Sequence, residues 1–428
     1  MHNEISKGDA SMRRRNKEKF GLGCRRAFIF SLSCNTERTH PVFLFLLAVL
    51  LFLPTQAAAQ KNFSTYKEKE RQSAAEFMRQ RNEAFAKYRR KIRRAFSEYR
   101  AKAVSVWGEA QAAVPNRQEW VTYRNEMRER RRVNFKEGQA AYEIIFKPGE
   151  EEIPDTVKSR LTALIVDSVV KGPDQRSIEE VAANPSDAEP GGEPLLQGLF
   201  RTESGKTVTR DNVRGFARKK VQNRLGKSKV EGKDGKQRVV ASVNVPMIPE
   251  HLRKLAKRYE GIVKDQAERR SLSPELVFAI IETESYFNPQ ARSPVPAFGL
   301  MQLVPVTGGQ EAYRIVYGKN EQPSEELLYK PDANVTLGSA YFHRLYYTYM
   351  EGIENDRSRL WCAVASYNTG PSNLYDTFSE KGKAAAINRI NSMSSEEVFD
   401  HLIDNLPYKE TRKYVQKVKK KMPKYKRM

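Results

Sequence analysis

The sequence is poor in cysteine and has no long apolar segment. Of its 428 residues only three are Cys, and two of these, Cys24 and Cys34, lie among the first 59. If those 59 residues are removed, Cys362 remains alone and can form neither an internal disulfide nor a zinc cluster. No apolar run approaches the ~20 residues of a spanning helix, which excludes a multispan membrane protein. Aromatic residues, at 10%, are too frequent for a wholly disordered chain.

The first 59 residues have the order of features that is typical of a secretory signal peptide. Basic residues come first, the apolar run 42–53 follows, and small residues lead up to Ala59. We therefore predict cleavage after Ala59 and an exported, periplasmic protein. An uncleaved membrane anchor is the alternative interpretation. No Cys closely follows the apolar run, so the sequence does not support a lipid anchor.

Acidic residues are scarce relative to basic ones. The chain has 75 Lys and Arg against 52 Asp and Glu, a net charge of +23. Without the leader, 66 basic and 48 acidic residues leave +18. Such a charge predicts an anionic partner, which could be nucleic acid, a membrane surface or an acidic polymer. Because the basic residues belong to an exported chain, we expect no nucleic-acid partner.

The chain after the leader divides into two regions of different texture. Residues 60–245 are predicted to form an α+β domain, with an amphipathic helix from Phe85 to near Trp107, a hairpin over 133–146 around Gly138 and a second alternating stretch at 239–247. The Gly/Lys-rich piece 226–236 is interpreted as a loose insertion. Residues 246–428 are predicted to form a mainly α-helical domain. Its basic tail from Lys417 is either a frayed terminus or a polymer-binding segment.

One helix of the second domain carries a carboxyl group on its apolar side. Ser273 and Pro274 are typical of a helix start, and the helix is expected to end before Pro289. Leu276, Ile280 and Glu284 recur at intervals of four, so Glu284 lies on the apolar stripe. A buried carboxyl near the negative end of a helix favours its protonated form, which suits a general acid.

Glu284 opens a series of motifs that closely resembles the signature of lysozyme-like lytic transglycosylases. Four segments follow in the order of that family: 284–302 (ESYFNPQARS and AFGLMQ), 331–342 (PDANVTLGSAYF), 365–371 (ASYNTGP) and 407–415 (PYKETRKYV). The upstream region, with Trp107, Trp120 and the hairpin, is similar to the N-terminal domain of the membrane-bound lytic murein transglycosylase C family. The expected fold is thus an α+β N-terminal domain followed by a lysozyme-like catalytic domain.

The resemblance also implies roles for individual residues. Glu284 would be the single catalytic acid and base, and Tyr367 would hydrogen-bond its carboxyl. Three positions would line the sugar cleft and a second acid would stand at its edge: Ser293, Gln302, Asn368 and Glu410. Each of these four also has a structural interpretation, as a turn, cap or helix-start residue. Tyr341 and Tyr414 are interpreted as core aromatics.

The implied activity is a peptidoglycan lytic transglycosylase that acts on glycan strands. It would cleave the β-1,4 bond between N-acetylmuramic acid and N-acetylglucosamine without water and leave 1,6-anhydro ends. Two alternatives remain open: a hydrolysing lysozyme of the goose type, and a non-catalytic protein that binds the cell wall. Association with the outer membrane or the cell wall is a further expectation. His251, His343 and His401 show no ligand spacing, so we predict no metal and no cofactor.

Overall fold

The computed structural model describes residues 41–146, 152–185 and 191–428. The chain divides into two units, Met1–Ser73 and Ala74–Met428, which are described separately. Helix α1 (Pro41–Trp107) begins in the first unit and ends in the second. Of the predicted leader, residues 1–40 lie outside the described residues and 41–59 belong to α1; cleavage after Ala59 stays a prediction. Within the described ranges, no helix combines the length and apolar character needed to cross a membrane.

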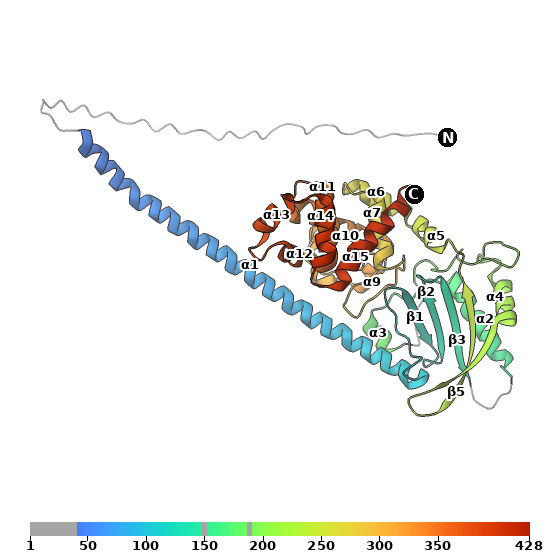
Figure 1. The fold of residues 1–428 in the computed structure, drawn as a ribbon. Coiled ribbons are helices and arrows are strands. Elements are labelled where there is room, and N and C mark those ends of the chain that lie inside the picture. Colours follow the sequence, from blue (N-terminus) through green and yellow to red (C-terminus); the bar gives the residue numbers. More distant parts are fainter. Residues whose placement is uncertain (1–40, 147–151, 186–190) are drawn as a thin grey trace, which may run out of the picture. The chain divides into compact units, whose positions relative to one another are not determined.

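The second unit contains one antiparallel sheet of five strands in the order β1-β2-β3-β5-β4 (Figure 1). The strands are β1 (Glu119–Arg124), β2 (Glu129–Asn134), β3 (Gln139–Phe146), β4 (Leu225–Glu231) and β5 (Gln237–Pro246). Asn134 pairs with Gln139 across the turn at Gly138, which confirms the expected hairpin. The alternating stretch at 239–247 is also confirmed as β5. Of the segment 226–236, interpreted as a loose insertion, residues 226–231 instead belong to strand β4, which pairs with β5, and residues 232–236 connect the two strands.

The sheet buries apolar side chains on both faces because successive residues of a strand point to opposite sides. Helices α2 (Asp155–Val170) and α4 (Val213–Arg224) share one core with Tyr142 of β3 and Val243 of β5. The last turns of α1 share a second core with Val121 of β1 and Val240 of β5. This second core also takes in the short helix α3 (Ile178–Ala183).

The C-terminal end of α1 is fastened to the sheet by a buried arginine. Arg130 lies with its guanidinium 3.8 Å from the centre of the Trp107 ring. It pairs with Glu143 on the neighbouring strand through two hydrogen bonds of 2.7 Å. The Trp107 indole donates to the Met127 carbonyl at 2.6 Å. Because the arginine is fully paired, its burial is compensated, and the helix ends at the residue expected from the sequence.

Residues 247–428 are mainly helical, as predicted, and are called the helical region here; residues 74–246 are called the sheet region. The elements of the helical region are α5 (His251–Arg258), α6 (Glu260–Arg269), α7 (Pro274–Glu284), η1 (Pro305–Gly309), α8 (Gln310–Tyr317), α9 (Glu325–Leu328), α10 (Pro331–Arg344), η2 (Leu345–Tyr349), α11 (Asp356–Thr369), α12 (Pro371–Phe378), α13 (Lys383–Asn391), α14 (Ser395–Asn405), α15 (Lys409–Lys421) and η3 (Met422–Tyr425).

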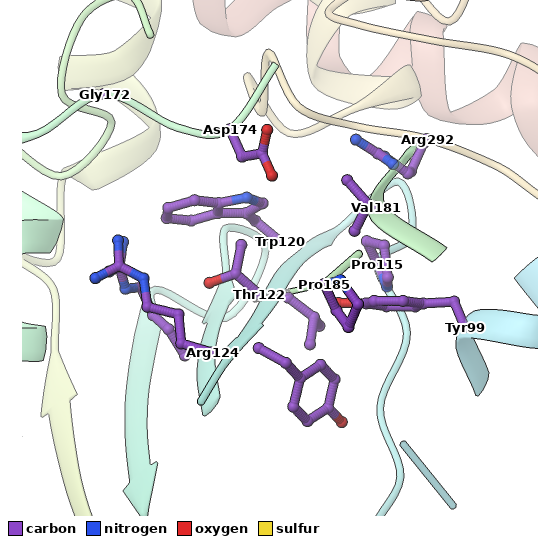
Figure 2. Close-up of a pocket in the computed structure, with 13 residues that line it drawn as sticks. Tyr99, Pro115, Trp120, Thr122, Arg124, Gly172, Asp174, Val181, Pro185 and Arg292 are labelled. Atoms are coloured by element: carbon purple, nitrogen blue, oxygen red, sulfur yellow. The ribbon is translucent and has the colours of Figure 1, made fainter. Parts of the chain in front are cut away.

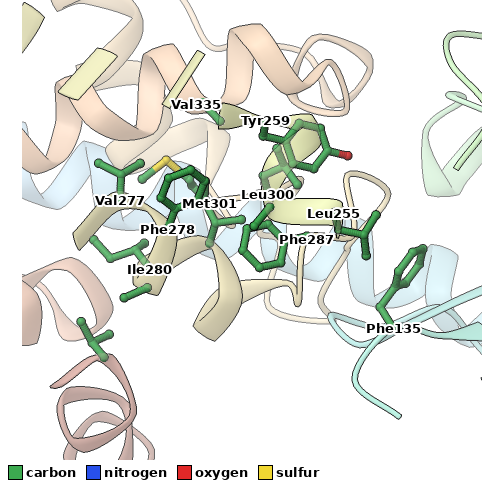
Figure 3. Packing of buried hydrophobic residues seen from close by; sticks show 14 of the residues in the cluster. Phe135, Leu255, Tyr259, Val277, Phe278, Ile280, Phe287, Leu300, Met301 and Val335 are labelled. Atoms are coloured by element: carbon green, nitrogen blue, oxygen red, sulfur yellow. The ribbon is translucent and has the colours of Figure 1, made fainter. Parts of the chain in front are cut away.

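The sheet region and the helical region share buried side chains. Phe135, in the β2–β3 turn, belongs to the same cluster as Leu255, Phe278 of α7 and Met301 (Figure 3). The His251 ring hydrogen-bonds the Phe135 carbonyl at 2.8 Å. The two regions are therefore held together by a common core, and loops of the sheet region can take fixed positions beside α7.

Candidate active site

Helix α7 places Glu284 at the inner end of a buried helical stripe. Ser273 occupies the N-cap position and Pro274 the first turn, as expected, but the Ser273 side chain makes no capping hydrogen bond. The stripe of Leu276, Ile280 and Glu284 is buried throughout. Glu284 is the last residue of the helix, with Ser285 as its C-cap. The predicted position of this carboxyl is therefore confirmed.

The surroundings of Glu284 favour a carboxyl that keeps its proton near neutral pH. The residue is 5% exposed, and burial raises its pKa to about 7. Arg117, the Tyr414 hydroxyl and Lys421 act against that rise, while the charge of Glu410 adds to it. Desolvation outweighs the attractive contacts. A pKa near 7 lets the group act as an acid and then as a base.

Glu282 lies two residues away on another face of α7, as expected, and has opposite surroundings. It is also buried, but the Tyr425 hydroxyl donates to its Oε2 at 2.7 Å and Lys424 Nζ lies 3.1 Å from its Oε1. Lys421 donates to its main-chain carbonyl at 2.8 Å. The Glu282 carboxylate is thus paired with Lys421 and Lys424, whereas desolvation dominates at Glu284. The contacts to Lys421, Lys424 and Tyr425 also show that the basic tail is folded and not frayed.

A residue of the sheet region reaches the same carboxyl. Arg117, in the loop before β1, has its Nη1 3.7 Å from Glu284 Oε2 and its Nη2 2.6 Å from Glu410 Oε1. The arginine therefore bridges the buried acid of α7 and an exposed acid in the first turn of α15. The motifs of the helical region do not contain Arg117, and sequence reasoning did not single it out.

Two tyrosines lie close enough to Glu284 for the charges to interact. Burial, then the charge of Glu284, raises the pKa of both Tyr367 and Tyr414 well above the usual value. Contrary to the expectation, the Tyr367 hydroxyl does not hydrogen-bond the Glu284 carboxyl. It donates to the Met301 carbonyl at 2.9 Å. The Tyr414 hydroxyl is buried and has no hydrogen-bond partner within the described ranges. Tyr414, interpreted from sequence as a core aromatic, nevertheless lies close enough for its hydroxyl to lower the pKa of Glu284.

The loop after α7 carries two of the predicted cleft residues, and both make local bonds. The Ser293 hydroxyl accepts a hydrogen bond from Val295 N at 3.2 Å, as a turn residue would. Gln302 Nε2 donates to the carbonyls of Ala291 and Gly299 at 3.1 and 3.0 Å, while its Oε1 is buried without a partner among the described residues. Contacts of either residue with sugar stay a prediction.

Asn334 of α10 holds this loop in place. It is fully buried, accepts from Met301 N at 2.8 Å and donates to the Phe298 and Leu328 carbonyls at 2.9 and 2.8 Å. Gly299 lies against it with φ of +76°, and a Cβ there would overlap the Leu328 carbonyl and the Asn334 amide. A glycine is therefore required at this position.

Asn368 and Glu410 meet the site through helix α15. Asn368 Oδ1 accepts from Thr411 Oγ1 at 2.7 Å, which joins the end of α11 to the first turn of α15. Glu410 lies in that turn with its side chain 64% exposed and paired to Arg117. The structure thus brings Glu284, Tyr367 and Glu410 to one place. Asn368 follows Tyr367 in α11, and its side chain is bonded to α15.

Two of the cavities among the described residues lie away from Glu284. The smaller, about 40 Å³, is lined by β1 and by Tyr99, Asp174 and Arg292, which face it in Figure 2. The larger, about 560 Å³, lies among Tyr88, residues 174–180 and residues 322–326. Glu284 lines neither of these two cavities. In the described part of the chain, no three His, Cys, Asp or Glu side chains are grouped to hold a metal.

Comparison with known families gives two matches, in the order of the two regions. Residues 85–258 match the family described as the N-terminal domain of membrane-bound lytic murein transglycosylase C. Residues 261–390 match the transglycosylase SLT domain, and this match contains Glu284, Ser293, Gln302, Tyr367 and Asn368. Glu410 lies beyond it.

Curated relatives match most of the chain. Membrane-bound lytic murein transglycosylase C of Edwardsiella ictaluri is 31% identical over 325 residues, 76% of this chain and 86% of that protein. The proteins of Shigella sonnei and Klebsiella pneumoniae subsp. pneumoniae are 30% and 32% identical over 324 residues, with the same coverage of this chain. Among solved structures, an inactive mutant of the lytic transglycosylase Slt from Pseudomonas aeruginosa is 30% identical, over 38% of this chain and 23% of that chain, with a TM-score of 0.29.

Proposed function

The chain belongs to the membrane-bound lytic murein transglycosylase C family and is a peptidoglycan lytic transglycosylase, and on this premise we propose that Glu284 alone serves as its acid and base. The observation that carries the proposal is the burial of Glu284, which raises its pKa to about 7. We propose the β-1,4 bond between N-acetylmuramic acid and N-acetylglucosamine as the bond that is cleaved, in an exported chain that acts at the cell wall.

In the first half of the reaction, protonated Glu284 gives its proton to the glycosidic oxygen as the bond from that oxygen to C1 breaks. The carboxylate that remains is buried, so its charge needs compensation. Arg117 and the Tyr414 hydroxyl lower the pKa of Glu284 and therefore stabilise its charged form.

In the second half, the Glu284 carboxylate takes the proton from the C6 hydroxyl of the muramoyl unit as that oxygen bonds to C1. The product is a 1,6-anhydro end, the carboxyl regains its proton, and no water is consumed. A second carboxylate as nucleophile is not needed because the substrate supplies its own oxygen, in contrast to the usual two-carboxylate glycosidase. Glu410 is exposed and paired to Arg117, which fits an edge position and not a second catalytic acid.

Product analysis of digested peptidoglycan sacculi tests this proposal. Wild type should release muropeptides with 1,6-anhydro ends, and Glu284→Gln should release none. Glu275→Gln, which removes a carboxyl from the first turn of the same helix, is the matched control. Reducing muramic acid without anhydro ends would instead identify a hydrolase. Binding to sacculi without any release would identify a wall-binding protein, and full activity of Glu284→Gln would contradict the assignment of the acid.

A further inference from the structure

We propose that Arg117 of the sheet region is a positioning residue of the active site, which holds Glu284 and Glu410 in a fixed relation and stabilises the charged form of Glu284. The inference rests on the proposed function of Glu284. It assigns the sheet region a part in the chemistry of the helical region. The geometry that supports it is a single guanidinium shared by two carboxyl groups of different helices.

The loop that carries Arg117 is fixed by hydrogen bonds on both sides of this residue. Asn116 Oδ1 accepts from the main-chain N–H groups of Gln118 and Glu119 at 2.8 and 3.0 Å, which forms an Asx turn. The Asn116 N–H donates to the Glu119 carbonyl at 2.9 Å, and the Phe135 N–H donates to the Gln118 carbonyl at 2.9 Å. Arg117 is therefore presented from the edge of the sheet by a closed turn.

The base of that turn is tied in turn to the helical region. Phe135 is fully buried in the shared core, and its carbonyl is bonded to His251 of α5. Glu119 of the turn pairs with Arg132 on β2 at 2.9 Å. The position of the guanidinium beside Glu284 thus follows from the packing of the two regions and not from the reach of a free side chain, which lowers the entropy cost of the contact.

The titratable groups around Glu284 come from three parts of the chain. Arg117 approaches from the sheet region, Tyr367 from α11, and three groups from α15: Tyr414, Glu410 and Lys421. Arg117 has the largest of the effects that lower the pKa of Glu284. When Glu284 has given up its proton, the guanidinium at 3.7 Å is the nearest opposite charge. Glu410 pairs with the same guanidinium at 2.6 Å, and its negative charge raises the pKa of Glu284.

These opposed effects allow a test in which two variants shift in opposite directions. The pH dependence of kcat/KM for muropeptide release from sacculi is measured with the full chain. Arg117→Ala should raise the pH at which activity is lost by about one pH unit. This is the lower end of the shift expected when an opposite charge is removed, because Arg117 is partly exposed. Glu410→Gln should move it downward. Arg117→Lys keeps the charge and should stay closer to wild type than Arg117→Ala.

Arg128→Ala, which removes an exposed arginine from the turn between β1 and β2, is the matched control and should leave the profile unchanged. A purely structural role would lower activity equally at every pH, and that result would overturn the inference. Activity above wild type at every pH for Arg117→Ala would also overturn it, because Arg117 would then be an inhibitory contact.

A titration that does not need turnover separates this inference from the proposed function. The carboxyl of Glu284 is followed by carbon NMR in protein with labelled glutamate, and its signal is assigned by its loss in Glu284→Gln. Arg117→Ala should raise the midpoint and Glu410→Gln should lower it. If wild type releases no muropeptides but the midpoints move in this way, the proposed function fails and the role of Arg117 stands. Unchanged midpoints in an active enzyme would contradict the role of Arg117 alone.

Discussion

The burial of Glu284 predicts that this carboxyl costs stability at neutral and alkaline pH. Its pKa in the folded chain is about 7, against an ordinary value of 4.5. Between those two pH values the folded state binds more protons than the unfolded state, so stability falls as pH rises. At about 1.4 kcal/mol for each pH unit, the full loss is about 3 kcal/mol, complete once the pH exceeds the folded pKa.

Glu284→Gln keeps the shape of the protonated acid and cannot ionise. The free energy of unfolding is measured by urea titration between pH 4 and 8 for wild type and variant. The advantage of the Gln variant should grow by about 3 kcal/mol across this range, because the other groups titrate equally in both proteins. Glu275→Gln controls for the loss of a carboxyl from α7. A difference that is constant with pH, or that shrinks as pH rises, would refute the reasoning.

Three further predictions concern the surroundings of the acid. Tyr414→Phe removes the hydroxyl that lowers the pKa of Glu284, so the pH at which lytic activity falls should move upward; an unmoved profile would contradict this contact. Glu282→Ala leaves the buried Lys421 its main-chain acceptor but removes the carboxylate that balances its charge, and should cost about 3 kcal/mol in urea unfolding; an unchanged free energy of unfolding would contradict the pairing. Gly299→Ala forces a Cβ against the Leu328 carbonyl at φ of +76° and should cost at least about 2 kcal/mol, measured as a lowered Tm; an unchanged Tm would show that the loop can move.

The sequence predicted the elements whose signal is local. The i, i+4 spacing on α7 was enough to place Glu284 on a buried stripe, and the alternation around Gly138 was enough to place the hairpin. Strands β1 and β4 were not predicted. They are the two edges of the sheet, and in β4 the exposed Lys227 and Lys229 hide the alternating pattern. Only their pairing with β2 and β5 identifies them.

Parts of the site that depend on tertiary contacts were beyond sequence reasoning. Arg117 is one of many arginines in a basic chain, and nothing near it in sequence indicates that the Asx turn aims it at Glu284. Tyr367 and Tyr414 both belong to motifs, but motif order does not tell which hydroxyl faces the carboxyl and which faces Met301. The contacts of the basic tail were likewise not predictable, because they are made with the buried Glu282, which lies far from it in the chain.

In the proposed reaction, Glu284 cleaves the glycosidic bond and the substrate's own C6 oxygen takes the place of water at C1. Digestion of sacculi in water enriched in oxygen-18, followed by mass spectrometry of the muramic acid ends, tests it most directly. We expect anhydro ends that are lighter by one water than reducing ends and carry no oxygen-18. Reducing ends that carry oxygen-18 would contradict it.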